Sequence, residues 1–238
     1  MNIAVIFAGG VGKRMGNSGV PKQFLKLYNK EIIVYTLELF EKNKLIDKII
    51  VSCLEDKIDL LMDLVIQYNL KKVVKIVKGG TTGQESIYNG LCVAEKISNS
   101  DEDIVLIHDG VRPLITDETI LDNINGVKLY GSSITIAPAI ETIIKEKEEY
   151  IIDILPRENC FLARAPQSFY LKDIFACHKK SKKDKKEFID SASMMSYYGY
   201  KLHLINGPAE NIKITTPIDF YMFKAILDMK NNIDVLGV

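Results

Sequence analysis

The strongest chemical signal in the sequence is a glycine-rich run that follows the apolar segment 2–8, a predicted buried strand. Four glycines and two adjacent cations make up this run: Gly9, Gly10, Gly12, Lys13, Arg14 and Gly16. Glycines at a strand end let backbone N–H groups approach an anion, and adjacent cations add charge-assisted donors. The run therefore predicts a phosphate site, and Lys22 in the following Pro-Lys-Gln triplet adds another cation nearby.

The spacing of this run excludes two common phosphate-binding loops. A P-loop requires Ser or Thr after its Gly-Lys pair, and Arg14 stands there. The dinucleotide fingerprint requires a further glycine at the position of Met15. A plain turn would explain one or two glycines, but it does not easily explain four glycines beside Lys and Arg. We therefore favour a phosphate site of another type.

A second polar motif, His-Asp-Gly-Val-Arg-Pro over residues 108–113, follows the predicted strand 104–108. Ligands of open α/β sheets bind at the carboxyl ends of strands, where Asp109 stands. A single carboxylate there could hold Mg²⁺ together with substrate phosphate oxygens. Alternatively, Asp109 and Arg112 form a structural pair that shapes the loop, and the motif alone does not decide between the two.

Two weaker motifs complete the set. The glycine-rich turn 79–86 precedes a predicted helix, and its amides and Ser86 could contact a base or ribose, or Thr82 or Gln84 could simply cap the helix. Lys213 lies in an apolar pattern that predicts a strand before the helix beginning at Pro217. It is either an edge residue with an exposed ammonium or a charge aimed into the site.

The elements that position these motifs alternate along the chain. Strands are expected at 2–8, 48–53, 72–77, 104–108 and 133–137, and helices at 32–40, 57–68, 85–97 and 118–129. This alternation predicts a doubly wound, mostly parallel α/β sheet. Beyond it we expect a β-hairpin or arm at about 139–162, helices at 169–179, 190–198 and 217–229, and a strand at 201–205. We expect one domain, 1–238.

Composition narrows the class of protein. Lys and Arg number 31, as do Asp and Glu, so the chain lacks the basic excess of a broad nucleic-acid footprint. No apolar run is long enough for a membrane span, and the first residues lack a signal-peptide pattern. The four cysteines form no CxxC pair, which favours buried thiols in a cytoplasmic protein over a zinc site. The basic run 179–186 is expected to be a solvated loop.

The motifs together favour one kind of chemistry. Several cations and one carboxylate are expected at strand ends, while no GxSxG elbow or Cys-His arrangement is present. Phosphoryl and nucleotidyl transfer depend mainly on positioning and charge neutralisation, so they fit this set better than nucleophilic catalysis does.

The sequence resembles the cytidylyltransferases that make CDP-alditols, namely the 2-C-methyl-D-erythritol 4-phosphate and the ribitol-5-phosphate cytidylyltransferases. The motifs that carry the resemblance run nearly from end to end: Ala8-Gly9-Gly10, Pro21-Lys22-Gln23, Gly79-Gly80, His108-Asp109-x-x-Arg112-Pro113, Ala165-Pro166-Gln167 and Asn211-Ile212-Lys213-Ile214-Thr215. The resemblance implies a Rossmann-like nucleotidyltransferase fold, CTP as donor, an alditol phosphate as acceptor, Mg²⁺, and a homodimer formed through a mid-chain arm.

The resemblance also implies roles for individual positions. Catalytic cations that hold the phosphates would be Arg14, Lys22 and Lys213. Contacts to the nucleotide would come from Ala8, Gly9, Gly10, Gly12, Gly80, Thr81, Ser86, Asp109 and Gly110, and Asp109 would also bind Mg²⁺. Contacts to the acceptor would come from Arg112, Asp190 and, across the dimer, Thr142 and Arg157.

The chain departs from the erythritol pattern mainly on the acceptor side. Gly110 and Val111 replace two alanines, Ala165 replaces a threonine before Pro-Gln, and Ile189 replaces a threonine before Asp190. We therefore favour the ribitol-5-phosphate branch, which makes CDP-ribitol for wall or capsule polymers, over the isoprenoid-pathway enzyme. Two less favoured hypotheses are a sugar-1-phosphate nucleotidyltransferase that uses UTP or dTTP and an inactive nucleotide-binding module.

Overall fold

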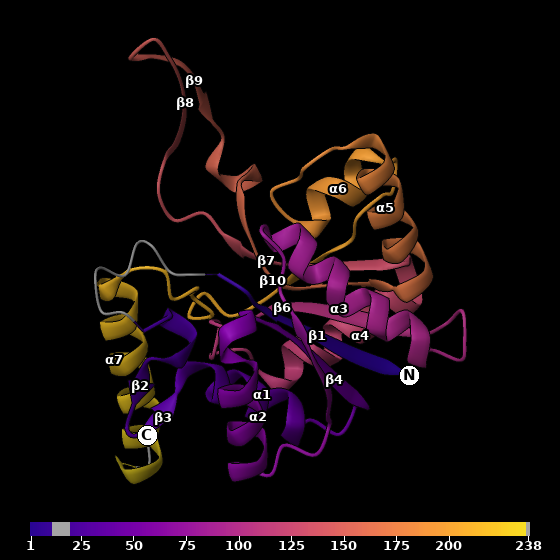
Figure 1. Cartoon of the computed structure of the whole chain (residues 1–238). Helices are drawn as coiled ribbons and strands as arrows, with labels where there is room; N and C mark the ends of the chain where they lie inside the picture. Colours follow the sequence, from indigo (N-terminus) through magenta and orange to yellow (C-terminus); the bar gives the residue numbers. More distant parts are fainter. Residues whose placement is uncertain (11–19, 237–238) are drawn as a thin grey trace.

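A seven-stranded sheet forms the centre of the fold in the computed structural model, which describes residues 1–10 and 20–236 (Figure 1). In spatial order its strands are β11 (Leu204–Asn206), β7 (Ser132–Pro138), β10 (Phe161–Tyr170), β6 (Ile104–Asp109), β1 (Asn2–Ala8), β4 (Lys48–Cys53) and β5 (Val73–Lys78). β10 runs antiparallel to β6 and β7, and the other neighbouring strands are parallel. The predicted mostly parallel α/β sheet is confirmed.

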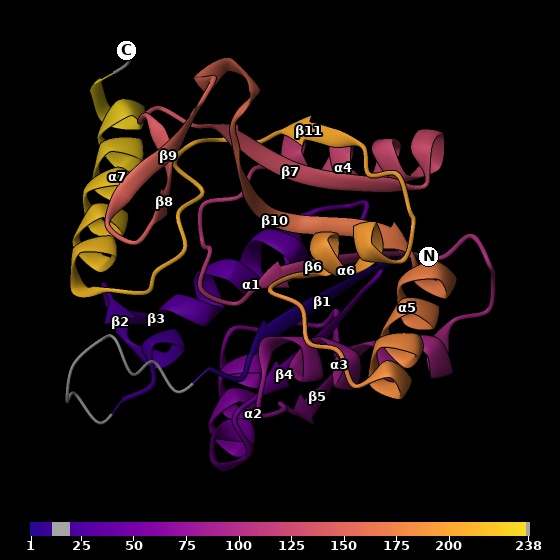
Figure 2. The same cartoon turned by 90° about the horizontal axis from the view of Figure 1, so that it is seen from above.

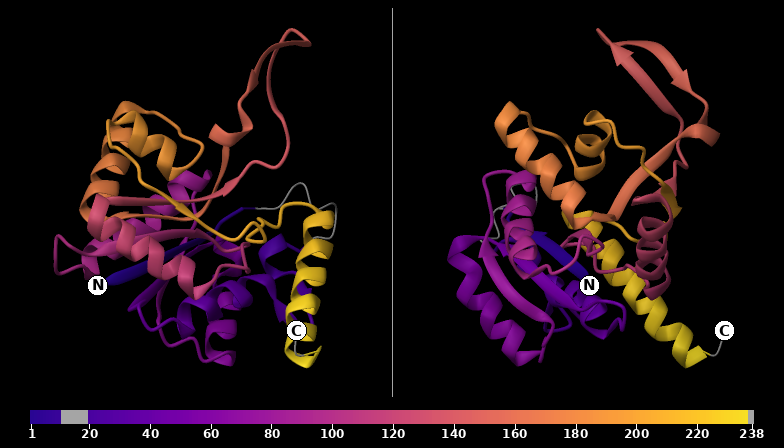
Figure 3. Two further views of the ribbon diagram at one scale, coloured as in Figure 1. Left: turned by 180° about the vertical axis from the view of Figure 1, so that it is seen from behind. Right: turned by 90° about the vertical axis from the view of Figure 1, so that its right-hand side faces the viewer.

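Helices cover both faces of this sheet (Figures 2 and 3). α1 (Ile32–Lys42), α2 (Ile58–Gln67) and α4 (Asp117–Tyr130) pack on the face to which Ala4 and Ile6 point. α3 (Gly83–Ile97), α5 (Leu171–Asp184) and α6 (Ser191–Tyr197) pack on the face of Ile3 and Val5. Alternate residues of a strand point to opposite faces, so β1 is apolar from Ile3 to Ala8 because both faces are covered.

A third apolar cluster joins the last helix to the body. α7 (Pro217–Leu236) packs through Phe223 against Ile32 at the start of α1 and Ile214 before the helix. The short strands β2 (Lys26–Leu27) and β3 (Lys30–Glu31) contribute Leu27 to the same cluster. Three 3₁₀ turns, η2 (Lys22–Phe24), η3 (Glu55–Lys57) and η4 (Arg157–Asn159), also lie in the described ranges.

The predicted arm is a hairpin of β8 (Ile143–Lys147) and β9 (Tyr150–Leu155), and it projects from the sheet (Figures 1 and 3). Its turn places Glu148 and Glu149 at positive φ, 54° and 69°. Its apolar side chains are solvent-exposed, with Tyr150 at 76% and Ile152 at 60%. Such a run of exposed apolar residues is unusual on an isolated surface.

Three expectations about local structure are wrong. The helix predicted at 169–179 begins at Leu171 because the preceding residues form β10, which pairs on both sides. Lys179 to Asp184 belong to α5 and are not loop, because the buried face of that helix continues to Ser181, whose hydroxyl donates to the Lys186 carbonyl (2.6 Å). The residues around Lys213 form no strand, and a hydrogen bond from the Ile214 N–H to the Val111 carbonyl (3.0 Å) anchors them instead.

All four thiols are free, but only Cys53 and Cys177 are buried as expected, whereas Cys92 and Cys160 are partly exposed. Across residues 1–10 and 20–236 the structure has no helix whose length and apolar character would suffice to cross a membrane.

Candidate active site

The parallel register brings the predicted motifs to one edge of the sheet. Phe7 pairs with Asp109 on β6, and Ala8 pairs with Cys53 on β4. Cys53 in turn pairs with Lys78 at the end of β5. The glycine run, the Asp109 motif and the glycine-rich turn after β5 therefore all leave the sheet at its carboxyl edge, where open α/β sheets bind ligands.

The glycine end of β1 is held by a buried amide. Gln23 Nε2 in η2 donates to the Ala8 carbonyl (2.6 Å) and to the Gly10 carbonyl (3.1 Å). A Cβ atom on Gly9 would lie 2.7 Å from Oγ of Ser86, so this close approach to α3 requires glycine. Gly12 and Arg14 lie outside the described residues.

The turn before α3 is organised by its own side chains. Thr82 caps the helix by accepting from the Glu85 N–H (3.1 Å), as the sequence suggested. Oγ of Ser86 accepts from the Gly80 N–H (2.9 Å) and donates to the Thr82 carbonyl (2.9 Å). The backbone N–H and the hydroxyl of Thr81 both donate to Oε2 of Glu85 (2.7 and 2.9 Å). These two bonds, the backbone one first, hold the pKa of Glu85 below its usual value.

Asp109 is the electrostatic centre of the site. Its Oδ1 lies 2.5 Å from Nζ of Lys213, and its Oδ2 accepts from Nε of Arg112 (2.9 Å). Burial would raise the pKa of Asp109, but the charges of Lys213 and Arg112 more than offset this and hold it below the usual value. Asp109 and Arg112 therefore form the structural pair, while the Mg²⁺ role of Asp109 stays a prediction. Lys213 is a charge aimed into the site.

The loop that carries Lys213 is fixed through a buried asparagine. Nη1 of Arg112 donates to the Asn211 carbonyl (2.7 Å), and Nδ2 of Asn211 donates to the Ala165 carbonyl (2.7 Å). His108 lies behind this network, with Nε2 3.1 Å from the Arg112 carbonyl oxygen. Burial lowers the pKa of His108 to about 4. A neutral imidazole is thus packed behind the ion pairs.

A cavity of about 190 Å³ lies over the glycine end of β1. The predicted nucleotide and phosphate residues that line it are Ala8, Gly9, Gly10, Lys22, Gly80, Thr81, Ser86, Asp109 and Lys213. Gly110 does not line this cavity. It packs behind the cavity, where a Cβ would lie 3.0 Å from Cβ of Ala8, and its N–H donates to the Phe7 carbonyl (3.0 Å).

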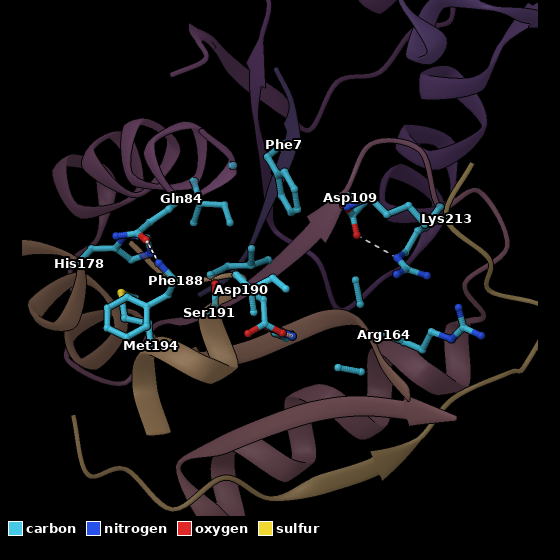
Figure 4. Close-up of a pocket in the computed structure, with 18 residues that line it drawn as sticks. Phe7, Gln84, Asp109, Arg164, His178, Phe188, Asp190, Ser191, Met194 and Lys213 are labelled. Atoms are coloured by element: carbon cyan, nitrogen blue, oxygen red, sulfur yellow. Dashed lines mark hydrogen bonds and ion pairs between the residues drawn. The ribbon is translucent and has the colours of Figure 1, made fainter. Parts of the chain in front are cut away.

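A larger cavity of about 270 Å³ adjoins the first (Figure 4). The two share four lining residues, Phe7, Gly83, Asp109 and Lys213. Two predicted acceptor residues, Arg112 and Asp190, line the larger cavity. Asp190 caps α6 and accepts from Nε2 of Gln167 (2.8 Å), so its carboxylate is held in place.

The other two predicted acceptor residues are not brought to either cavity of their own chain. Thr142 and Arg157 are exposed on the arm and its base. Nη1 of Arg157 donates to the Ile140 carbonyl (3.3 Å). A single chain therefore brings Arg112 and Asp190 to the larger cavity, but not Thr142 and Arg157.

Sequence reasoning missed Arg164, which lines the larger cavity from β10 (Figure 4). The signal for it was present, because Arg164 is a charge directly before the Ala-Pro-Gln motif in a mainly apolar stretch. It was not recognised because β10 itself was not predicted.

The side chains near the cavities can be compared with the ligands that the predicted Mg²⁺ would need. Among the residues that the structure describes, no group of three or more His, Cys, Asp or Glu side chains is placed to hold a metal ion. Mg²⁺ in nucleotide sites usually takes one or two carboxylates and completes its shell with phosphate oxygens and water. A single carboxylate such as Asp109 fits a cation held mainly by a triphosphate.

The fold and the paired cavities define a Rossmann-like α/β protein with a cationic, glycine-rich site at the carboxyl edge of its sheet. Residues 2–229 match the family model of 2-C-methyl-D-erythritol 4-phosphate cytidylyltransferase (IspD). The chain is 53% identical over 239 residues to a ribitol-5-phosphate cytidylyltransferase of Vibrio parahaemolyticus, with all of both chains covered.

Two further relatives agree with this match. A 2-C-methyl-D-erythritol 4-phosphate cytidylyltransferase of Clostridium botulinum is 41% identical over 228 residues, covering 95% of this chain and 97% of that protein. The crystal structure of 4-diphosphocytidyl-2C-methyl-D-erythritol synthase from Anaerococcus prevotii superposes with a TM-score of 0.82 at 26% identity, covering 95% of this chain and 98% of that one. The chain belongs to the IspD family of cytidylyltransferases, which are nucleotidyltransferases.

Proposed function

We propose that this cytidylyltransferase transfers the cytidylyl group of CTP to ribitol 5-phosphate, giving CDP-ribitol and pyrophosphate. The observation that carries the proposal is the pair of adjoining cavities that share Asp109 and Lys213. One cavity has the glycine strand end expected for a triphosphate, and the other has cations and fixed polar groups suited to a phosphorylated polyol. The shared residues lie where the two substrates would meet.

The donor nucleotide occupies the smaller cavity in this proposal. Amides of Gly9 and Gly10 and the ammonium of Lys22 bind the phosphates, and the turn 80–86 contacts the cytidine. Gly12 and Arg14 are assigned to the same phosphate loop from the sequence. The glycine at position 9 lets the backbone lie against Ser86, beside the cavity where the phosphates would bind.

The acceptor phosphate is itself the nucleophile. One of its oxygens forms a bond to the α-phosphorus of CTP, the bond from the α-phosphorus to the α–β bridging oxygen breaks, and the electron pair leaves on pyrophosphate. A phosphomonoester carries its second negative charge above about pH 6, so no general base is needed. Lys213 stabilises the charge that develops on the α-phosphate, and Asp109 holds Lys213 in position.

We also propose that Mg²⁺ accompanies CTP, with Asp109 as its protein carboxylate. When bound, the ion would neutralise part of the triphosphate charge. Asp109 retains lone pairs for this role because each of its oxygens forms one ion pair.

Ribitol 5-phosphate is preferred as the acceptor on two grounds. Identity is higher to the ribitol-5-phosphate relative, 53%, than to the erythritol-phosphate relative, 41%. The departures from the erythritol pattern at Ala165 and Ile189 also line the larger cavity, where the acceptor would bind. CDP-ribitol made in the cytoplasm would serve as a precursor for wall or capsule polymers.

A homodimer would complete the acceptor site. The arm exposes Tyr150, Ile151 and Ile152, which a second copy could cover. Thr142 and Arg157, which line neither cavity of their own chain, would then reach the larger cavity of the partner. The dimer is proposed on this incompleteness together with the exposed apolar arm.

Pyrophosphate release tests the proposal. The protein is incubated with CTP and Mg²⁺ and with either ribitol 5-phosphate or 2-C-methyl-D-erythritol 4-phosphate. Release with ribitol 5-phosphate alone supports the proposal, and release with the erythritol phosphate alone moves the protein to isoprenoid synthesis. Turnover of UTP with glucose 1-phosphate and none with CTP would instead indicate a sugar-1-phosphate nucleotidyltransferase. CTP binding without any release would indicate an inactive nucleotide-binding module.

A further inference from the structure

Arg164 lies where β10 passes the end of β6. Gln167 pairs with Ile107 in the antiparallel register, so the residues before Gln167 run beside those that follow Ile107. The pairing of β10 with β7 shifts register just before Gln167, and Arg164 falls in this irregular stretch. Its side chain lines the larger cavity on the same side as Asp109 and Lys213 (Figure 4).

Arg164 differs from the neighbouring cations because it has no counter-ion in the part of the chain that the structure describes. Arg112 and Lys213 both pair with Asp109. Within residues 1–10 and 20–236, no acidic side chain forms an ion pair with Arg164, and its Nε atom is buried without a hydrogen-bond partner. Burial and, after it, the charge of Arg112 lower the pKa of Arg164.

An unpaired, partly buried guanidinium favours an anionic ligand, because a bound anion supplies the charge and the acceptor atoms that are missing. Its planar donors match two phosphate oxygens at once. Arg164 does not line the smaller cavity, where the triphosphate is proposed to bind. The anion it serves is therefore the second one in the reaction, the phosphate of the acceptor.

We propose that Arg164 binds the acceptor phosphate and holds it facing the α-phosphorus of CTP. This inference rests on the proposed function and adds a specificity-determining residue to it. Two highly charged phosphates must approach each other before the new P–O bond forms. Arg164 neutralises the acceptor phosphate from the side opposite the nucleotide, while Lys213 acts at the wall that both cavities share.

Steady-state kinetics of Arg164→Gln test this role with ribitol 5-phosphate and CTP varied in turn. We expect the KM for ribitol 5-phosphate to rise about 10- to 100-fold and the KM for CTP to change less than about twofold. Arg164→Lys keeps the charge but loses the planar fork, so it restores part of the acceptor affinity. The control is Lys172→Gln on α5, a half-exposed lysine whose nearest acidic partner is Asp101 at 3.8 Å, and it leaves both KM values unchanged.

Inorganic phosphate provides a readout that does not depend on turnover. It should compete with the acceptor in the wild type, and its Kd by calorimetry should weaken about tenfold or more in Arg164→Gln. Equal increases in both KM values, or an unchanged acceptor KM with unchanged phosphate binding, would overturn the proposal. Thermal melts exclude unfolding, and Arg164→Lys remains informative if Arg164→Gln is destabilised.

The same measurements separate this inference from the proposed function. If the wild type uses 2-C-methyl-D-erythritol 4-phosphate instead, the proposed acceptor is wrong, and the KM comparison with that acceptor decides the role of Arg164. If it uses neither acceptor, the Kd for inorganic phosphate decides: weaker binding in Arg164→Gln supports the role, and equal binding contradicts it.

Discussion

Nζ of Lys213 lies 2.5 Å from Oδ1 of Asp109, and these two residues border both cavities of the site. The carboxylate is buried, while 39% of the lysine side chain is exposed. Asp109 thus fixes a cation at the wall that both cavities share, without taking it out of reach of a ligand. The second oxygen of Asp109 is held by Arg112, so the carboxylate cannot rotate freely.

Lys213→Ala should lower kcat for pyrophosphate release about 100-fold or more, because removing one preorganised donor to developing charge has effects of that size. The melting temperature should also fall, because the buried Asp109 keeps only Arg112 as a partner, so kcat is compared at a temperature at which thermal melts show both proteins to be folded. Lys224→Ala on α7, another lysine with a carboxylate partner (Asp228, 2.7 Å), is the matched control and should retain activity. A kcat within twofold of the parent for Lys213→Ala would remove Lys213 from the mechanism.

Gly9→Ala should lower kcat/KM for CTP about 100-fold, because the added carbon would lie 2.7 Å from Oγ of Ser86 and displace the turn that Ser86 organises. At Gly10 none of the described residues lies within 4 Å of an added carbon, so Gly10→Ala should keep the larger share of activity. Kinetics with varied CTP and thermal melts of both variants check this. An equal loss of kcat/KM in both variants would show that the close approach of Gly9 to Ser86 does not determine activity with CTP.

The sequence allowed the parallel part of the fold and most of the nucleotide side to be predicted. Buried parallel strands are mostly apolar and end at glycines or polar motifs. β1 is apolar from Ile3 to Ala8 before its glycines, and β6 is apolar from Ile104 to Ile107 before His108 and Asp109. β10 was missed because an antiparallel strand that continues from a hairpin into the core has no single period. Arg164 lies in β10, so it was also missed as a site residue.

Two other features of the site could not be predicted from local sequence patterns. The position of Lys213 depends on Asn211, which is hydrogen-bonded both to Arg112 and to the Ala165 carbonyl in β10. Hydrogen bonds between residues so far apart in the sequence produce no periodic pattern from which they could be predicted. The failure to bring Thr142 and Arg157 to the cavities of their own chain follows from the arm projecting away from the sheet. The role proposed for them would depend on a second chain, which a single sequence does not display.

Glu85→Ala should weaken the preference for CTP over UTP by about tenfold. The Thr81 hydroxyl donates its hydrogen to Glu85, so its oxygen is left as an acceptor beside the smaller cavity. An acceptor selects the amino group of cytosine over the carbonyl of uracil, provided the base binds at this turn. Without Glu85 the hydroxyl can donate to uracil. The ratio of kcat/KM for the two nucleotides measures the effect.

Glu95→Ala, an exposed glutamate on the same helix, is the control for this comparison and should leave the ratio of the two nucleotides unchanged. If Glu85→Ala lowers activity with CTP and UTP equally, the hydrogen bond supports the turn but does not select the base.

Stability should fall as the pH falls from about 6.5 towards 4. Burial lowers the pKa of both His108 and His178 to about 4, from an ordinary value of 6.5. In this window the unfolded chain binds protons that the folded protein does not, so the stabilisation is complete above pH 6.5 and is lost on acidification. At pH 5, each histidine lowers the free energy of unfolding by about 2 kcal/mol relative to its value above pH 6.5.

Urea unfolding at pH 7.5 and 5.0 tests this pH dependence. His178→Gln should reduce the loss of stability between these two pH values by about 2 kcal/mol relative to the parent, because one titrating group is removed. An equal loss in parent and variant would show that other groups carry the pH dependence.

Arg157→Ala and Lys213→Ala should complement each other if the arm serves the partner's site. Each variant alone is expected to be impaired, because every site lacks one of the two residues. A heterodimer of the two chains has one site with both substitutions and one site with neither.

Random mixing of equal amounts should therefore restore about a quarter of the wild-type activity, since half of the dimers are mixed. The measurement is pyrophosphate release after co-refolding or co-expression, with the mixed dimer identified by native mass spectrometry. Activity that stays at the level of the separate variants in a confirmed mixed dimer would place Arg157 outside the partner's site.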